Sequence, residues 1–322
     1  MKKVFVERNP SAIIPLTGGF GNQLFQFAFG IYVQKVIGQK VKYDSCIGKP
    51  RYTGDYVSLF SINSDTSIEV FKEGFYFKKL FSKSYGWNLS HGLEIIAEKS
   101  LRNKVLKRVT VTLLRIKFKS LNNVTVSKNL GLDKSINLSK PSIFIGYFQT
   151  FFYASSPKVF ETLCGIEPKY LSKKYYKLRD YILQTKPILL HLRLTDYLIE
   201  DKFGVPSINY YQSAINEMST DRYLSEVWII SDDTNGARQH LEKVSGNFQI
   251  VNFDQSGLSD VEVWDLMRYF SGYVISNSSF AWWAAFLRRD RKAPVYAPEP
   301  WFQGMDSPNE LIPRDWIRFP SS

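Results

Sequence analysis

The stretch that decides the fold is Pro187-Ile188-Leu189-Leu190-His191-Leu192-Arg193-Leu194-Thr195-Asp196-Tyr197. It begins with a short apolar run, which predicts a buried strand. An imidazole, a guanidinium and a carboxylate follow directly on one short segment, at His191, Arg193 and Asp196. A plain strand would not collect these groups, so the segment indicates a site that holds an anion.

Outward from this stretch, the second half of the chain alternates short apolar runs with segments of helical period. The apolar runs cover residues 188–192, 227–231, 249–253, 273–276 and 294–297, and the helical segments cover residues 210–218, 235–243, 260–270 and 280–288. This alternation predicts an open parallel sheet with helices on both faces. The first half begins in the same way, with strands over 12–16, 40–43 and 142–147 and a helix over 23–37. Topology places a domain boundary between residues 150 and 185.

The composition is that of a globular protein, because 322 residues with 44% hydrophobic content can bury two cores. The first residues lack a sustained apolar segment, which favours a cytoplasmic protein. The two cysteines, Cys46 and Cys164, are far apart and form no metal-ligand or redox spacing. With only three histidines and no Asp-x-Asp triplet, metal-dependent chemistry has little support.

The net charge of +12 calls for an acidic partner, which nucleic acid, an anionic membrane or a phosphorylated small molecule could supply. Residues 99–119 carry basic charges only, interleaved with apolar residues. Such a segment is either a solvated helix with a core face or a membrane-surface helix. The chain has no recognisable helix-turn-helix, zinc module or RNA-binding aromatic signature, which argues against nucleic acid.

Three other turns also fit an anion site. Glycines in Thr17-Gly18-Gly19-Phe20-Gly21-Asn22-Gln23 let backbone N–H groups approach a ligand, although a tight turn without a ligand would look the same. In Ser276-Asn277-Ser278-Ser279-Phe280, the serines either cap a helix or leave its N–H groups to a phosphate. In Ser231-Asp232-Asp233-Thr234, a carboxylate either accepts hydrogen bonds from a purine or ribose or caps the next helix.

In this order and spacing, three segments resemble the bacterial α-1,2-fucosyltransferases of glycosyltransferase family 11. They are GGFGNQLFQFA at residues 18–28, HLRLTDY at residues 191–197 and SNSSFAWW at residues 276–283. Residues 146–149, residues 203–207 before Tyr210-Tyr211, and residues 231–233 fit the same pattern. The matches run from residue 18 to residue 287, which is most of the chain.

The resemblance implies an α/β, GT-B-like fold, in which two Rossmann-like domains face a central cleft. Residues 1–155 would form the N-terminal acceptor-side domain and residues 156–322 the C-terminal GDP-sugar-binding domain. The implied reaction is inverting transfer of L-fucose from GDP-β-L-fucose to a galactoside hydroxyl in O-antigen or surface polysaccharide synthesis, with no metal or cofactor. The acceptor would be an oligosaccharide or a lipid-linked glycan, and residues 99–119 would then contact the anionic inner membrane face.

The resemblance also implies which residues form the donor site. Arg193 would neutralise the charge that develops on the departing GDP, because a guanidinium gives a phosphate two directed hydrogen bonds. The remaining donor-binding residues would be Gly19, Gly21, Asn22, Gln23, His191, Asp232, Asp233, Asn277, Ser278, Ser279 and Phe280.

Inversion calls for a base that accepts the proton of the attacking hydroxyl, and Asp196, Glu200 and Asp201 are the candidates. Asp201 is favoured by its position, which matches the acid of a distantly related core fucosyltransferase, whereas Asp196 could instead pin Arg193. Family members commonly have two consecutive arginines, but Leu194 follows Arg193 here, which leaves another GDP-deoxyhexose such as colitose open. A nucleic-acid-binding or glycan-binding protein without catalysis is the alternative of another class.

Overall fold

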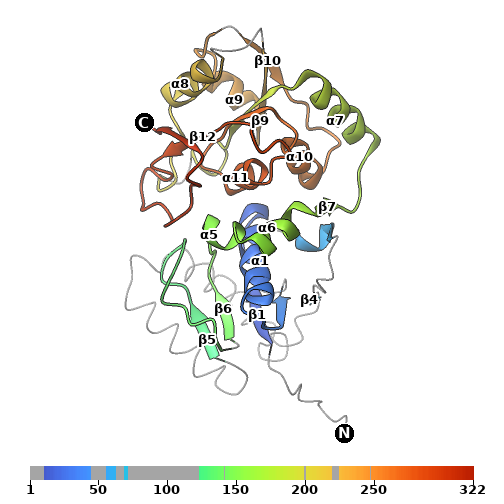
Figure 1. The fold of residues 1–322 in the computed structure, drawn as a ribbon. Helices are drawn as coiled ribbons and strands as arrows, with labels where there is room; N and C mark the ends of the chain where they lie inside the picture. The colour runs from blue at the N-terminus through green and yellow to red at the C-terminus, as the bar shows by residue number, and fades with distance from the viewer. Residues whose placement is uncertain are drawn as a thin grey trace, which may run out of the picture. The chain divides into compact units, whose positions relative to one another are not determined.

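The computed structural model describes residues 11–44, 56–62, 69–71, 123–140, 142–198, 201–219, 225–246 and 248–322. The chain divides into two compact units (Figure 1). The first comprises Met1–Ser58, Ile62–Ile166 and Pro308–Leu311, and the second comprises Leu59–Ser61, Glu167–Ser307 and Ile312–Ser322. A short segment near the C-terminus therefore belongs to the N-terminal unit.

The described part of the first unit contains a parallel sheet in the order β4-β2-β1-β6-β5. Its strands are β1 (Ala12–Pro15), β2 (Val41–Asp44), β4 (Glu69–Phe71), β5 (Asn123–Val126) and β6 (Ser142–Ile145). Helix α1 (Phe20–Lys35) packs on β1 and β2 and against α5 (Phe151–Ala154) and α6 (Pro157–Cys164). In the sequence between β2 and β4, a short helical turn η1 (Val57–Leu59) precedes β3 (Phe60–Ile62), which pairs with β7 (Ile166–Pro168). Most residues of this two-stranded sheet belong to the second unit.

The second unit contains a parallel sheet in the order β10-β9-β8-β11-β12-β13. Its strands are β8 (Ile188–Leu192), β9 (Ser225–Ser231), β10 (Phe248–Asn252), β11 (Gly272–Val274), β12 (Val295–Glu299) and β13 (Ile317–Pro320). Counted within the unit, this order is 3-2-1-4-5-6, which is the Rossmann order. The order reverses between β8 and β11, and ligands of such sheets bind beyond the strand ends at that point.

Helices cover both faces of this second sheet. They are α7 (Lys173–Thr185), α8 (Ile208–Ser219), α9 (Thr234–His240), α10 (Asp260–Met267) and α11 (Ser279–Phe286). Because side chains alternate along a strand, Ile188, Leu190 and Leu192 of β8 share one core with residues of α8 and α9. Trp228 of β9 faces the other way, where its ring contacts Tyr181 of α7 and Phe270 beyond α10.

The predicted α/β class with parallel sheets is confirmed. The strand and helix order predicted for residues 188–297 is also confirmed, with ends that differ by a few residues. Helix α1 begins at Phe20 rather than near Gln23, because the helix starts directly after its N-cap Gly19. Helix α7 was not predicted, since several of its tyrosines and leucines lie exposed and blur the helical period.

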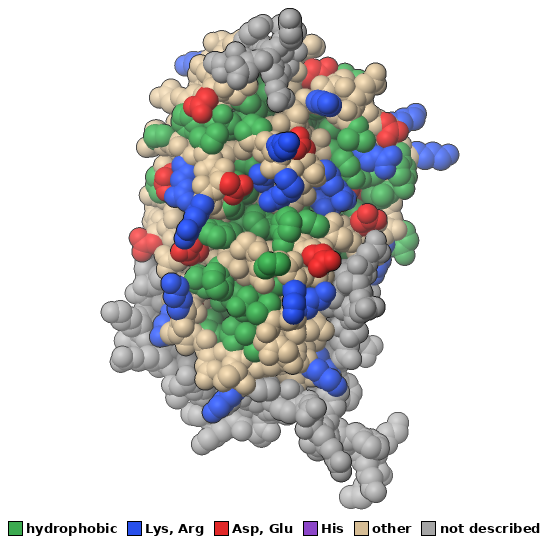
Figure 2. Space-filling model, viewed as in Figure 1, with side chains coloured by type: hydrophobic (Ala, Val, Ile, Leu, Met, Phe, Trp, Pro, Cys, Tyr) green, Lys and Arg blue, Asp and Glu red, His purple; other side chains and the backbone are tan. Residues whose placement is uncertain are grey.

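The basic stretch over residues 99–119 lies outside the described residues. Within the described residues, no helix is both long and apolar enough to cross a bilayer. On the face shown in Figure 2, lysine and arginine side chains are interspersed with acidic and apolar ones. The net charge is therefore not gathered into a single patch of the surface that this view shows.

Candidate active site

The candidate site lies where β8 and β11 end, at the reversal point of the second sheet. Register pairs Leu190 with Val274, so the segments after these two strands leave the sheet side by side. The segment after β8 carries Arg193 and Asp196, and the segment after β11 carries Asn277 and Ser278. The sheet topology thus brings together two of the four sequence segments that indicated an anion site.

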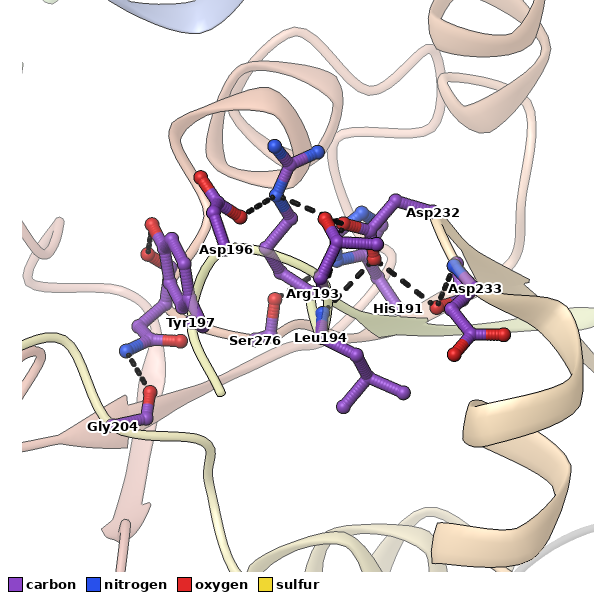
Figure 3. A network of polar contacts seen from close by, with 12 residues as sticks. His191, Arg193, Leu194, Asp196, Tyr197, Gly204, Asp232, Asp233 and Ser276 are labelled. Carbon is purple, nitrogen blue, oxygen red and sulfur yellow. Dashed lines mark hydrogen bonds and ion pairs between the residues drawn. The ribbon is translucent and has the colours of Figure 1, made fainter. Parts of the chain in front are cut away.

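Arg193 is held from one side by two carboxylates. Its Nε donates to Asp196 Oδ1 at 2.8 Å and lies 3.2 Å from Asp232 Oδ2. Figure 3 shows that both terminal nitrogens of the guanidinium point away from these carboxylates. Among the described residues, neither terminal nitrogen has a hydrogen-bond partner. The arrangement fixes the plane of the guanidinium and leaves its two terminal nitrogens available to a ligand.

Opposing effects act on the pKa of Arg193. Burial lowers it, but the hydrogen bond to Asp196 and the charge of Asp232 outweigh burial, so the pKa lies above its ordinary value. The guanidinium therefore stays charged at every pH at which the protein is folded. A permanent cation with a fixed orientation is the group that a leaving diphosphate requires.

Asp232 follows β9 and supports the loop that carries Arg193. Its carboxylate accepts hydrogen bonds from the backbone N–H groups of Leu194 at 2.9 Å and Thr195 at 3.3 Å, and from the Thr195 hydroxyl. Burial alone would raise its pKa, but these hydrogen bonds and the charge of Arg193 hold the pKa below its usual value. Asp232 is thus engaged by its own chain, and its predicted contact with guanine or ribose stays a prediction.

Asp233 lies at the start of α9, where its Oδ1 accepts from Gly236 N at 2.9 Å. The capping alternative that the sequence offered for this position is therefore confirmed. Its other oxygen, Oδ2, has no hydrogen-bond partner among the described residues. A role of Asp233 in nucleotide recognition stays a prediction that uses this second oxygen.

His191 lies on β8 and is buried beneath the site. Its Nδ1 is 2.9 Å from the Ser276 hydroxyl, and its ring lies 6.3 Å from the ring of Phe280. Burial lowers the pKa of His191 to about 3, the nearby charge of Asp232 raises it, and that of Arg193 lowers it further. His191 is therefore neutral at neutral pH and can donate only one ring N–H.

The buried His191 predicts that stability falls in mild acid. Unfolded histidine titrates near pH 6.5, so below that pH His191 binds a proton in the unfolded chain but stays neutral in the folded protein. This contribution is complete above about pH 6.5 and should decline by about 2 kcal/mol between pH 6.5 and pH 5. Urea unfolding at both pH values should show a smaller loss for His191→Gln than for wild type. Equal losses would contradict the prediction, and His240→Gln is the matched control.

Helix α11 starts at this site without a side-chain cap. Ser278 is its N-cap residue and is buried, yet its hydroxyl makes no cap hydrogen bond. An uncapped helix N-terminus is a site where backbone N–H groups bind phosphate. The aromatic residues behind it, Trp282 and Trp283, are completely buried and form part of the core.

The side chain of Asn277 holds a neighbouring loop. Its Nδ2 donates to the carbonyl oxygens of Phe203 and Gly204, at 2.9 Å each. Its backbone carbonyl accepts from the Tyr197 hydroxyl at 3.1 Å. The side-chain N–H groups of Asn277 thus bind the protein's own backbone, and the predicted contact of Asn277 with the GDP-sugar stays a prediction.

The three candidate acids have different surroundings. Asp196 is partly exposed and pins Arg193, as one alternative from the sequence had it. Asp201 is exposed, and its side chain has no hydrogen-bond partner among the described residues. Glu200 lies outside the described residues. The identity of the base stays a prediction.

The glycine turn belongs to the first unit, where α1 follows β1. Gly18 has a φ of +73° and lies so close to Asn22 that a Cβ would meet Asn22 Nδ2 at 2.8 Å. Gln23 donates to Gly18 O at 3.0 Å and accepts from Tyr56 N, so both ends of its amide stabilise the turn. Asn22 Oδ1 accepts from Gln149 at 2.8 Å, which leaves its Nδ2 directed at the turn. Donor binding by Gly19, Gly21, Asn22 and Gln23 stays a prediction.

Sequence reasoning missed the residues that support these turns. Gln26 accepts from Thr17 N at 2.8 Å and donates to the Thr17 hydroxyl and to Gly146 O. Thr195 and Tyr197 hold the ends of the loop after β8. The position of Gln26 within the otherwise apolar stretch of residues 24–33 was the available signal, because a buried amide needs hydrogen-bond partners.

The family model of glycosyl transferase family 11 matches residues 176–303, which include Arg193, Asp196, Asp232, Asn277 and Ser278. Over this region the chain is thus similar to glycosyltransferase family 11. The resemblance seen in the sequence is therefore confirmed, and the protein is a glycosyltransferase. The uncapped helix, the clamped arginine and the reversal point of the sheet all lie within the matched region.

Known relatives are similar to this transferase to different extents. An alpha-1,2-colitosyltransferase of Escherichia coli is 25% identical over 321 residues, covering 94% of this chain and 97% of the relative. The O-antigen biosynthesis glycosyltransferase WbnK of Escherichia coli is 29% identical over 132 residues, covering 40% of this chain and 43% of the relative.

Solved structures are also similar to this transferase. Fucosyltransferase NodZ from Bradyrhizobium is 14% identical with a TM-score of 0.47, covering 86% of this chain and 93% of NodZ. POFUT1 in complex with GDP is 12% identical with a TM-score of 0.46, covering 91% of this chain and 99% of POFUT1.

Proposed function

We propose that this family 11 transferase moves L-fucose, or a related deoxyhexose such as colitose, from its GDP ester to a galactoside hydroxyl. The proposal includes inversion at the anomeric carbon and an α-1,2 linkage in an O-antigen or surface polysaccharide. The alpha-1,2-colitosyltransferase similar to nearly the whole chain supports the linkage and the deoxyhexose class. The relative WbnK supports a place in O-antigen synthesis.

The single observation that carries the proposal is the orientation of Arg193. Its Nε is engaged by Asp196 and Asp232, and its terminal nitrogens face away from both. When the bond between the anomeric carbon and the β-phosphate oxygen breaks, GDP takes the electron pair and gains negative charge. Two parallel N–H donors from one guanidinium stabilise that charge more than a single donor does.

The N-terminus of α11 provides a second element of the diphosphate site. The helix lacks a side-chain cap, and its partial positive charge favours an anion. Buried His191 lies behind it and is neutral, so it adds no charge to the site. Backbone and guanidinium together can hold the diphosphate through directed N–H groups.

On the acceptor side, the proposed base is Asp201. Its carboxylate accepts the proton of the acceptor hydroxyl while that oxygen forms its bond to the anomeric carbon. Asp201 is exposed and has no hydrogen-bond partner among the described residues, so its carboxylate is available to an acceptor. Asp196 is less suited, because it already holds Arg193.

Turnover of GDP-fucose and GDP-colitose tests this function. The purified protein is incubated with each donor and a panel of galactosides, and both GDP release and the linkage of the product are measured. We expect the two donors to differ clearly in kcat/KM, because they differ by one hydroxyl and a buried polar contact discriminates strongly. The function is rejected if neither donor is bound or turned over.

A chelator arm of the same assay tests metal independence. Among the described residues, no group of three or more His, Cys, Asp or Glu side chains could hold a metal ion. We expect excess EDTA to leave GDP release unchanged, because the proposed stabilisation of the leaving group uses Arg193 and the N-terminus of α11. Inhibition that added Mg²⁺ or Mn²⁺ reverses would overturn metal independence alone, and the transferase proposal would remain.

A further inference from the structure

The loop between β8 and α8 is held along its backbone by two other segments. Four consecutive carbonyl groups, those of residues 202–205, each accept a hydrogen bond. Gly304 N donates to Lys202 O at 3.1 Å, and Gln303 N donates to Phe203 O at 3.2 Å. Asn277 Nδ2 donates to both Phe203 O and Gly204 O, at 2.9 Å each. Gln303 Nε2 donates to Val205 O at 3.1 Å. These hydrogen bonds fix the backbone course of residues 202–205.

Asn277 holds this loop at two places. Its side chain binds the carbonyls of Phe203 and Gly204, while its own carbonyl accepts from the Tyr197 hydroxyl at 3.1 Å. The rings of Tyr197 and Phe203 stack with their centroids 4.7 Å apart. The segments around Tyr197 and around Phe203 are therefore joined to each other and to Asn277, and Figure 3 shows Tyr197 and Gly204 of these two segments.

Gly304 holds the same loop by close approach. A Cβ at position 304 would lie 2.6 Å from Asp201 O and 2.7 Å from Lys202 Cα. Both of these are backbone atoms, so a larger residue could not be accommodated by rotation of a side chain. Position 304 itself is exposed, which means that its close contact serves the loop and not a core.

We propose that Asn277 and Gly304 are positioning residues, which set the place of Asp201 relative to Arg193. Arg193 and Asp201 lie on the same loop, the first fixed by Asp196 and Asp232 and the second by the clamp on residues 202–205. This inference rests on the proposed transferase function. It gives Asn277 a role different from the donor contact that the sequence resemblance implied.

The first test is Gly304→Ala. The added methyl group should shift the Asp201 backbone by a fraction of an ångström, and a misplacement of this kind should lower kcat about 10- to 100-fold. GDP affinity, measured by calorimetry, should stay within about twofold, because the variant leaves Arg193 and α11 untouched. Asp306→Ala changes an exposed residue in the same segment as Gly304. This variant is the matched control, and its kcat should equal that of wild type.

The second test is Asn277→Ala. A positioning role predicts a lower kcat with nearly unchanged GDP affinity, whereas a donor-binding role predicts a parallel loss of both. A shared loss would therefore overturn the inference, and so would wild-type kcat in Gly304→Ala. Thermal unfolding of each variant separates these results from loss of the fold.

Hydrogen exchange separates this inference from the proposed function. The backbone amides of Gln303 and Gly304 donate to the loop, so Asn277→Ala and Gly304→Ala should both speed exchange in residues 301–306. If wild-type protein turns over no GDP-sugar, the proposed function fails, yet exchange still reports the clamp. Unchanged exchange in both variants would overturn the clamp itself.

Discussion

Arg193→Ala should lower kcat about 1000-fold, while the protein remains folded. In the proposed mechanism the guanidinium faces the leaving diphosphate, and loss of one such electrostatic contact typically costs 100- to 1000-fold in rate, about 2.7–4 kcal/mol. Arg193→Lys should recover little of this loss. Lysine keeps the charge, but it cannot bind Asp196 and Asp232 on one edge and present two parallel donors on another.

Steady-state kinetics of GDP release measure this effect, and circular dichroism verifies the fold. Arg179→Lys is a matched control, because Arg179 also binds a carboxylate through Nε, that of Asp180 at 3.2 Å, but lies on α7 away from the site. Near-wild-type turnover in Arg193→Ala would contradict the role given to this residue. Full activity in Arg193→Lys would show that charge alone suffices.

Asp201→Asn should lower kcat about 100- to 10 000-fold, the range that general-base catalysis contributes. The amide keeps the shape of the carboxylate but cannot accept the acceptor proton. Asp196→Asn should have a smaller effect, because its amide oxygen can still accept from Arg193 Nε while the charge is lost. Glu200→Gln should change kcat little.

The pH profile of kcat/KM distinguishes these three acids. Wild type should lose activity as the base becomes protonated in acid, and Asp201→Asn should lose this acidic limb. The donor KM should change most in Asp196→Asn, since that residue orients Arg193. If Glu200→Gln gives the largest loss and removes the acidic limb, the base is Glu200 and the assignment to Asp201 is wrong.

The sequence predicted the place of the site because strand ends are readable from the chain. The apolar run over Ile188–Leu192 predicts a buried strand, so a guanidinium at position 193 must emerge at the carboxyl edge of the sheet. The parallel order then requires the segment after β11 to lie beside it. Local pattern and sheet topology suffice for these two statements.

The partners of Asp232 and Asn277 could not be predicted in the same way. Asp232 hydrogen-bonds residues 37 and 38 positions earlier, and Asn277 binds carbonyls 73 and 74 positions earlier. Such contacts depend on where irregular loops run, and no periodicity encodes that course. The sequence therefore predicts that a polar residue beyond a strand end belongs to a site. It does not distinguish a residue that binds the ligand from one that supports a neighbouring loop.

The two carboxylates on Arg193 also bear on product release. GDP leaves the reaction more negative than it was as an ester, and an unshared arginine would bind that product strongly. Here the positive charge is already balanced by Asp196 and Asp232, 2.8 and 3.2 Å from Nε. Their repulsion of the diphosphate offsets part of the attraction of the guanidinium. In the proposed mechanism, the two carboxylates that orient Arg193 toward the bond being broken would thus also help the spent nucleotide to depart, so that the enzyme can begin another cycle.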